Sequence, residues 1–303
     1  MIKPPRPQTK KSNQKPWQPP ERKAVTIVAG FKCQEGIVIC ADSQETVPGL
    51  LKRNIPKLHF EPQGTIPKSD ELAAIFAGAT ESGPFLDRLI TDCWNEVRKA
   101  KSLEQACGFA DEAIKHHYKE YGGIYQQGYC PTAELVFGLK MQGHSRLFHS
   151  FDAVVNEVEG SKLYTASGIG QYLADFLIPR SFHAHLNIYQ VIAIATYLLF
   201  QAKKHVDGCG GDSHVAFLRN KGTSGEVEYA IVETVGHLAS LVDSRWGSIL
   251  PRYADPSTPH EEFERLAKDA IQILTHERDQ TLKKLSEWND FWEKSIEQLG
   301  LEK

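Results

Sequence analysis

The sequence lacks three features that would place it in a specialised class of protein. Its apolar runs stop short of the roughly 18–20 residues that a transmembrane helix needs, and its N-terminal segment has no apolar core of a secretory signal. Its net charge of −3 gives no general attraction to nucleic acid or to an anionic membrane. Its cysteines, at positions 33, 40, 93, 107, 130 and 209, form no CxxC pair, which favours buried thiols over disulfides or a metal site. We therefore expect a cytoplasmic protein with no metal, no nucleic acid and no membrane partner.

The overall composition is that of an ordinary globular protein, and only the N-terminal segment is unusual. The 303 residues are 41% hydrophobic and 24% charged, enough to bury the core of one large domain with an appendage. Residues 1–25 hold six prolines and seven lysines or arginines against one glutamate. A segment of this composition cannot bury enough apolar surface to fold, so we predict a disordered extension.

Residues 26–42 combine a predicted hairpin with chemically useful side chains. Two apolar runs, Thr26–Cys33 and Ile37–Ala41, flank a Gln-Glu-Gly turn, which is typical of a β-hairpin. The first run opens with a hydroxyl, Thr26, the second is followed by Asp42, and Lys57 stands beside a later apolar run. A threonine hydroxyl becomes a nucleophile only when a base takes its proton. The residue's own α-amine, with a pKa of about 7.7–8.0, can do so when it is free.

The rest of the chain alternates predicted groups of strands with predicted pairs of helices. We predict strands at 72–79, 133–140, 145–150, 152–158, 162–166, 213–219 and 226–233, and helices at 81–101, 102–121, 187–206 and directly after Gly170. This order favours an α+β fold of two stacked antiparallel sheets covered by helices. Beyond residue 233, a capping pattern at 258–261 and a three-and-four spacing predict one or two long amphipathic helices. Such a helix either packs on its own domain or binds a neighbouring subunit.

These residues resemble the proteasome-type N-terminal nucleophile (Ntn) hydrolases, specifically their β-subunits. Thr26, Gly30, Gly36 and Asp42 fall at the family spacing without a gap, and Lys57 follows after a one-residue deletion. IFAGATES at 75–82, ASGIGQY at 166–172 and HVDGCGGDSHVAFL at 205–218 match further family elements. The resemblance covers roughly residues 26–233 and implies a four-layer αββα sandwich, with 1–25 as an extension and 234–303 as a helical C-terminal extension.

The resemblance also implies a catalytic role for four of the matched residues. Thr26 would be the nucleophile, Lys57 would lower the pKa of its hydroxyl, and Asp42 would fix the position of that lysine. Gly78 matches the glycine whose backbone N–H stabilises the tetrahedral oxyanion.

Four further residues match the family's supporting positions. Asp207 matches an acid that supports the threonine end. The family's two supporting serines fall at Gly168 and Gly210 here, and Ser167 stands beside the first of these and could supply its hydroxyl.

The predicted function is therefore a threonine-type hydrolase that cleaves peptide or amide bonds, needs no cofactor and assembles as a homo-oligomeric ring. Val25 precedes Thr26 where the family has a small glycine, so self-removal of the extension would be hindered; translation starting at position 25 would instead expose Thr26. The alternative is a non-catalytic subunit of the same fold that acts as a ring or scaffold interaction protein. An amidase acting on a small molecule is a third possibility.

Overall fold

The structure, a computed structural model, describes residues 26–46, 52–63, 67, 71–80, 82–122, 131–253 and 259–299. The predicted disordered extension 1–25, with Val25, lies outside these residues.

One five-stranded antiparallel sheet carries the two N-terminal strands at its centre. Its order is β10-β1-β2-β11-β12, with β1 at Val28–Cys33, β2 at Gly36–Asp42, β10 at Tyr164–Ser167, β11 at Ser213–Arg219 and β12 at Gly225–Glu226. The hairpin predicted from the sequence is confirmed, since Cys33 pairs with Gly36 across a two-residue turn. Thr26 lies two residues before β1, and Asp42 is the last residue of β2.

A second five-stranded antiparallel sheet has the order β5-β6-β7-β8-β9. Its strands are β5 at Leu58–Glu61, β6 at Ala73–Thr80, β7 at Ala133–Met141, β8 at His144–Phe151 and β9 at Val154–Glu157. A separate two-stranded sheet joins β3, Gln44–Thr46, to β4, Lys52–Asn54. Lys57 thus lies directly before the edge strand of the second sheet.

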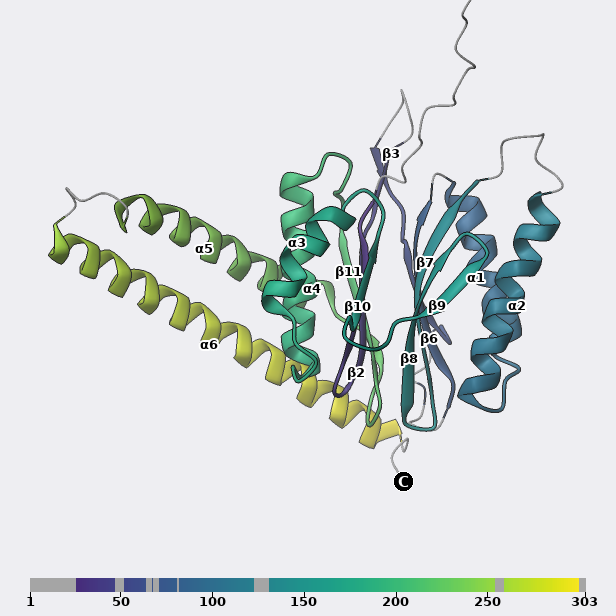
Figure 1. Ribbon diagram of the computed structural model, residues 1–303. Coiled ribbons are helices and arrows are strands. Elements are labelled where there is room, and N and C mark those ends of the chain that lie inside the picture. The colour runs from purple at the N-terminus through teal and green to yellow at the C-terminus, as the bar shows by residue number, and fades with distance from the viewer. Residues whose placement is uncertain are drawn as a thin grey trace, which may run out of the picture.

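Six helices accompany the sheets in the described part of the chain. They are α1 at Gly83–Val97, α2 at Leu103–Gly122, α3 at Gln171–Ser181, α4 at Ile188–His205, α5 at Tyr229–Tyr253 and α6 at His260–Leu299. In Figure 1, α3 and α4 lie beside the sheet that holds β1, and α1 and α2 lie beside the other sheet. The predicted α+β class with antiparallel sheets is confirmed.

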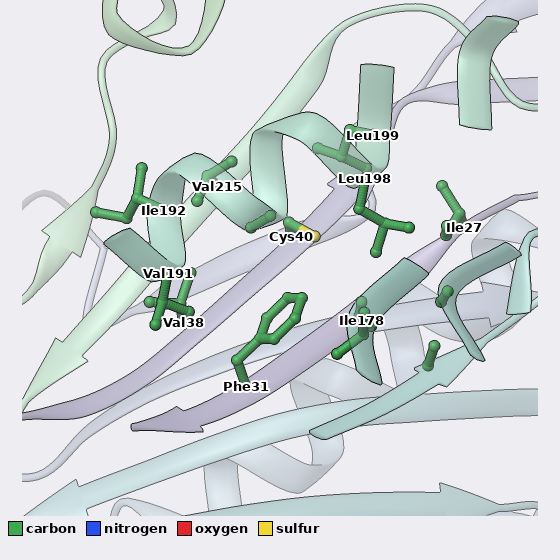
Figure 2. Close-up of a cluster of buried hydrophobic side chains, with 14 of the residues drawn as sticks. Ile27, Phe31, Val38, Cys40, Ile178, Val191, Ile192, Leu198, Leu199 and Val215 are labelled. Carbon is green, nitrogen blue, oxygen red and sulfur yellow. The ribbon is translucent and has the colours of Figure 1, made fainter. Parts of the chain in front are cut away.

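Three apolar clusters hold these elements together. Val28, Ile39 and Val136 belong to a cluster between the two sheets. Because successive residues of a strand point to opposite faces, β1 also sends Phe31 to the other side, where it meets α4. Figure 2 shows Phe31, with residues of β2 and α4, in this second cluster. A third cluster packs α1 and α2 on the outer face of β6 and β7. The strands near Thr26 are thus held by packing on both faces.

The strand predicted at 226–233 is wrong over most of its length, because α5 begins at Tyr229. Over so short a window, the apolar residues of 226–233 fit the alternating pattern of a strand. The buried positions of the longer segment recur at three-and-four spacing: Ile231, Val232, Val235 and Ala239. The predicted domain boundary at residue 233 consequently falls inside α5.

Helices α5 and α6 form a pair whose joined end extends away from the sheets, whereas the C-terminal end of α6 lies below β2 in the view of Figure 1. The single long α6 agrees with the spacing of its apolar residues. Ala270 and Thr281 are its buried residues in the described part, and Lys284 Nζ lies 3.3 Å from Thr234 Oγ1 of α5. Among the described residues, no helix is both long and apolar enough to cross a membrane.

Candidate active site

Thr26, Asp42 and Lys57 meet in one buried cluster. Lys57 Nζ lies 2.6 Å from Thr26 Oγ1 and 3.0 Å from Asp42 Oδ1. The Thr26 hydroxyl donates a hydrogen bond to the same carboxylate oxygen. Thr26 is 1% exposed, Asp42 0% and Lys57 8%. A hydroxyl, a carboxylate and an ammonium that are up to 31 residues apart in the sequence therefore touch one another.

Strand pairing brings these three residues together. The register of β1 and β2 places Val28 opposite Ala41, and the Asp42 N–H continues the ladder by donating to the Ile27 carbonyl at 3.2 Å. Thr26 and Asp42 therefore stand side by side at the end of the hairpin.

The Asp42 carboxylate is the centre of the cluster. Its Oδ1 also accepts the Ile27 N–H at 3.1 Å, and its Oδ2 accepts the Gly210 N–H at 2.9 Å. With Thr26 and Lys57, four donors therefore surround it. Hydrogen bonds to a charged group are about twice as strong as neutral ones, so this carboxylate fixes the positions of its neighbours.

Burial lowers the pKa of the Lys57 ammonium from its ordinary value, and the Asp42 carboxylate opposes that shift. Lys57 also donates to the carbonyl of Gln44. A buried cation at hydrogen-bond distance favours the ionised form of a hydroxyl. The arrangement can therefore stabilise negative charge as it develops on Thr26 Oγ1.

Gln44 and Cys209, to which the sequence analysis gave no role in the site, also adjoin the cluster. Burial raises the pKa of the Cys209 thiol to about 12; Asp42 adds to this shift, and Lys57 opposes it. The thiol is consequently neutral at physiological pH. Cys209 and the buried Cys33, Cys40 and Cys93 are free thiols, as predicted, and Cys107 is a free thiol that is partly exposed. Cys130 lies outside the described residues.

Gly78 lies next to Lys57, with its N–H already bonded. That N–H donates to the Lys57 carbonyl at 3.2 Å. A Cβ on Gly78 would come within 2.3 Å of Leu86 Cδ1, so a larger residue here would have to displace that side chain of α1. Its role as an oxyanion donor stays a prediction, and it requires that the bond to Lys57 be exchanged for one to the substrate.

On the opposite side, Thr26 meets the segment between β10 and α3. The Gly170 N–H donates to the Thr26 carbonyl at 3.1 Å. Gly168 has a φ of +84°, and a Cβ there would lie 2.4 Å from the same carbonyl oxygen. The Ser167 hydroxyl donates to the Glu134 carboxylate instead of to Thr26.

Of the remaining predicted residues, Gly210 belongs to the cluster through its N–H and Asp207 does not. Asp207 is exposed, and none of the described residues forms a hydrogen bond or an ion pair with it. In the part of the chain that the structure describes, no group of three or more histidine, cysteine, aspartate and glutamate residues is placed to hold a metal ion.

The overall fold is that of solved Anbu structures. The structure titled Anbu (ancestral beta-subunit) from Yersinia bercovieri matches 77% of this chain and 100% of its own, with a TM-score of 0.60 and 13% identity. The helical assembly of the Anbu complex from Pseudomonas aeruginosa matches 78% and 99%, with a TM-score of 0.61 and 14% identity. Anbu from Hyphomicrobium sp. strain MC1 matches 74% and 97%, with a TM-score of 0.58 and 12% identity. No family model and no curated protein matches the chain.

These findings correct the resemblance stated from the sequence. The similar structures are Anbu proteins, a family distinct from the β-subunits of proteasome-type Ntn hydrolases to which the motifs pointed, so that assignment is wrong. At 12–14% identity the likeness shows the fold alone.

Proposed function

We propose that this protein is a threonine-type hydrolase that cleaves peptide or other amide bonds with Thr26 as its nucleophile. The observation that carries the proposal is the 2.6 Å distance between Lys57 Nζ and Thr26 Oγ1, with both groups bound to the buried Asp42 carboxylate. A fixed cation where an oxygen becomes negative is the preorganised arrangement that lowers a reaction barrier, since it needs no reorientation during the reaction.

The reaction requires that residues 1–25 be removed, because only then does Thr26 have a free α-amine. That amine takes the hydroxyl proton as Oγ1 attacks the substrate carbonyl carbon. The C–O bond forms, the C–N bond breaks, and the proton passes to the leaving amine. Water then hydrolyses the ester, which releases the acid and restores the threonine hydroxyl.

Three apolar clusters support a further part of the proposal, an αββα sandwich of four layers. In such a sandwich the Thr26 cluster lies at one end of the two stacked sheets, and a substrate reaches it only once Thr26, now 1% exposed, is uncovered. Four buried free thiols support a reducing compartment, the cytoplasm.

A protein prepared to begin at Thr26 tests the proposal. With a threonine-reactive epoxyketone, which bonds to a hydroxyl and an α-amine together, we expect one adduct in the intact mass. The full-length chain, whose Thr26 amine is blocked, should form none. Thr26→Val, which keeps the shape and removes the hydroxyl, serves as the matched control.

Turnover of fluorogenic peptides and of small amides by the same protein identifies the class of substrate. Hydrolysis of both kinds or of peptides supports a peptidase, and hydrolysis of small amides alone supports an amidase. Absence of both adduct and turnover in the protein that begins at Thr26 would overturn the proposal.

A second candidate function is that of a non-catalytic interaction subunit. It is favoured by the burial of Thr26, which is 1% exposed, and by the Gly78 N–H, which already has a carbonyl acceptor. The intact mass of natively produced protein separates the two candidates. A chain that begins at Met1 and forms no adduct supports the interaction subunit.

We also propose that the chain self-associates. The Pseudomonas aeruginosa structure is described as a helical assembly of the Anbu complex, and this chain shares its fold. Mass photometry of the purified protein and electron microscopy distinguish a closed ring from a helical assembly, and a purely monomeric mass would contradict the proposal.

A further inference from the structure

Gln44 contacts the site through its backbone and its side chain at once. It is the first residue of β3, two residues after Asp42, and it is buried. Its carbonyl accepts a hydrogen bond from Lys57 Nζ, and its N–H donates to the Gly210 carbonyl at 3.0 Å. Its side-chain Nε2 donates to the Gly208 carbonyl at 3.0 Å. One residue thus connects the ammonium to the loop at 208–212.

The same loop holds the carboxylate of the site. Gly210 donates its N–H to Asp42 Oδ2. Two more hydrogen bonds join the loop to the residue that follows Asp42. The Ser43 N–H donates to the Asp212 carbonyl at 3.0 Å, and the Asp212 N–H donates to Ser43 Oγ at 2.6 Å. Displacing the 208–212 loop would therefore move Asp42 as well.

The side-chain amide of Gln44 takes the space above Gly210. A Cβ on Gly210 would lie 2.4 Å from Gln44 Oε1 and 3.0 Å from Gln44 Cδ. The backbone of Gly210 has no positive φ, so its conformation does not by itself require glycine. With its amide bonded to the Gly208 carbonyl, Gln44 therefore leaves no room for a side chain at position 210, and the amide must shift before one can fit.

We propose that Gln44 is a positioning residue that holds the Lys57 ammonium and the Asp42 carboxylate in one geometry by fastening β3 to the 208–212 loop. This inference rests on the proposed function and deepens it. The backbone carbonyl of Gln44 sets the position of Lys57, and its amide fixes the loop that binds Asp42. The glycine at 210 leaves room for that amide.

Gln44→Met tests the role of the amide, because methionine keeps the length of the side chain and the backbone carbonyl. In the protein that begins at Thr26, we expect kcat to fall about tenfold or more, since small displacements of reacting groups are costly. KM should change far less, because Gln44 is proposed to act through Lys57 and Asp42 and not on the substrate. Gln44→Glu is the second variant. Glutamate keeps the shape of the side chain but puts a carboxylate oxygen where the amide donated to the Gly208 carbonyl, so the two oxygens repel each other. We expect kcat to fall at least as much as in Gln44→Met.

A readout that does not depend on activity is the pKa of Lys57, followed by NMR in full-length protein labelled at the lysine ε-carbon. The signal is assigned with Lys57→Met. The charged or titratable groups that act on Lys57 are Asp42, Glu45 and Cys209, and none of them is substituted in Gln44→Met. We expect Gln44→Met to raise the pKa of Lys57 toward its ordinary value, because a released loop admits water.

The space above Gly210 provides a double-mutant cycle. Gly210→Ser should be strongly destabilising in the natural chain and much less so together with Gln44→Ala, which vacates the space. Gly225→Ser is the matched control, because a Cβ at Gly225 meets nothing within 4 Å. Its cost should be the same in both backgrounds.

An unchanged pKa of Lys57 in Gln44→Met would overturn the inference, and so would an equal cost of Gly210→Ser in the two backgrounds. Both results are obtained on protein that need not hydrolyse anything. If the natural chain beginning at Thr26 shows no turnover, the proposed hydrolase fails. The pKa and the cycle then still decide whether Gln44 positions Lys57.

Discussion

Thr26 is held from two sides that are built in different ways. On the side of β2 and β3, charged and polar side chains bind its hydroxyl: Asp42 and Lys57, with the backbone carbonyl of Gln44 behind them. On the side of β10 and α3, the backbone N–H of Gly170 binds its carbonyl, and the Ser167 hydroxyl is bonded to Glu134 instead. We call these the charged flank and the backbone flank.

The two flanks depend on different properties of the residues that form them. The charged flank sets the state of the hydroxyl, the atom that would attack. The backbone flank fixes the position of the main chain. There Gly168 lies so close to the Thr26 carbonyl that the position requires glycine and has no room for a reactive side chain. Substitutions on the first flank should therefore act through charge, and substitutions on the second through space. Four predictions follow this distinction, from the largest expected effect to the smallest.

Asp42→Ala should have the largest effect, because it leaves the Lys57 ammonium buried without its carboxylate. Removing one partner of a buried ion pair costs about 3–5 kcal/mol, which urea unfolding measures as a lower free energy of unfolding. Glu96→Ala is the control, since Glu96 pairs with Lys99 at the exposed surface, where such pairs contribute about 0–1 kcal/mol. Equal costs for the two variants would show that the charged flank is not a buried ion pair in solution.

Gly168→Ala should disrupt the backbone flank by about 2–3 kcal/mol. An alanine there meets the Thr26 carbonyl and also adopts an unfavourable positive φ. Gly160→Ala separates the two causes, because Gly160 has a φ of +77° and a Cβ there meets nothing within 4 Å. We expect that variant to cost about 1 kcal/mol. If both cost the same in thermal unfolding, the close approach to Thr26 contributes nothing.

Lys57→Met should change how stability depends on pH. The pKa of Lys57 is lowered in the folded chain, so between that value and the ordinary lysine value only the unfolded chain carries the proton. Stability from this group is therefore present above the ordinary value and is lost as pH falls through the lowered one. In the methionine variant, the alkaline rise should shrink by at most about 1.4 kcal/mol per pH unit, the limit for one proton.

Unfolding of both proteins in urea across the alkaline range gives the difference in slope. The neighbouring Cys209 thiol also titrates at alkaline pH, so the comparison is repeated in Cys209→Ala. Identical slopes with and without Lys57 would mean that its pKa is ordinary in the folded chain.

Ser167→Ala should have the smallest effect, about 1 kcal/mol, because it removes one hydrogen bond to Glu134 and leaves Thr26 untouched. Ser145→Ala, which removes a side-chain hydrogen bond to Asn220, is the matched control. The pKa of Lys57 should not move in Ser167→Ala. A shift would show that the backbone flank takes part in the electrostatics of the site.

The sequence allowed the hairpin, β11 and α4 to be predicted, because each has a clear apolar period and a clear end. The helix α4, for example, begins at an Asn187 cap that Gln190 completes. It also allowed Thr26, Asp42 and Lys57 to be grouped, since motif spacing reflects strand pairing. The start of α5 was missed because a window of eight residues fits both the two-residue period of a strand and the 3.6-residue period of a helix.

Gln44 could not be found in the same way. Its carbonyl binds Lys57 through the backbone, which every residue type has, and its amide matters only because the loop at Gly208 and Gly210 returns from far along the chain. Asp207 shows the converse. Its position in a motif suggested a role in the site, yet its side chain is exposed. Sequence spacing identifies neighbours along strands better than it identifies contacts made by loops.

The paired helices α5 and α6 have a consequence for how the molecule behaves in solution. At 1.5 Å per residue, the 40 residues of α6 span about 60 Å. An outline with such a projection meets more friction than a sphere of equal mass, so the chain will elute early from a sizing column calibrated with globular standards. An early elution volume must therefore not be taken as proof of a dimer, and the count of subunits needs a method that weighs particles.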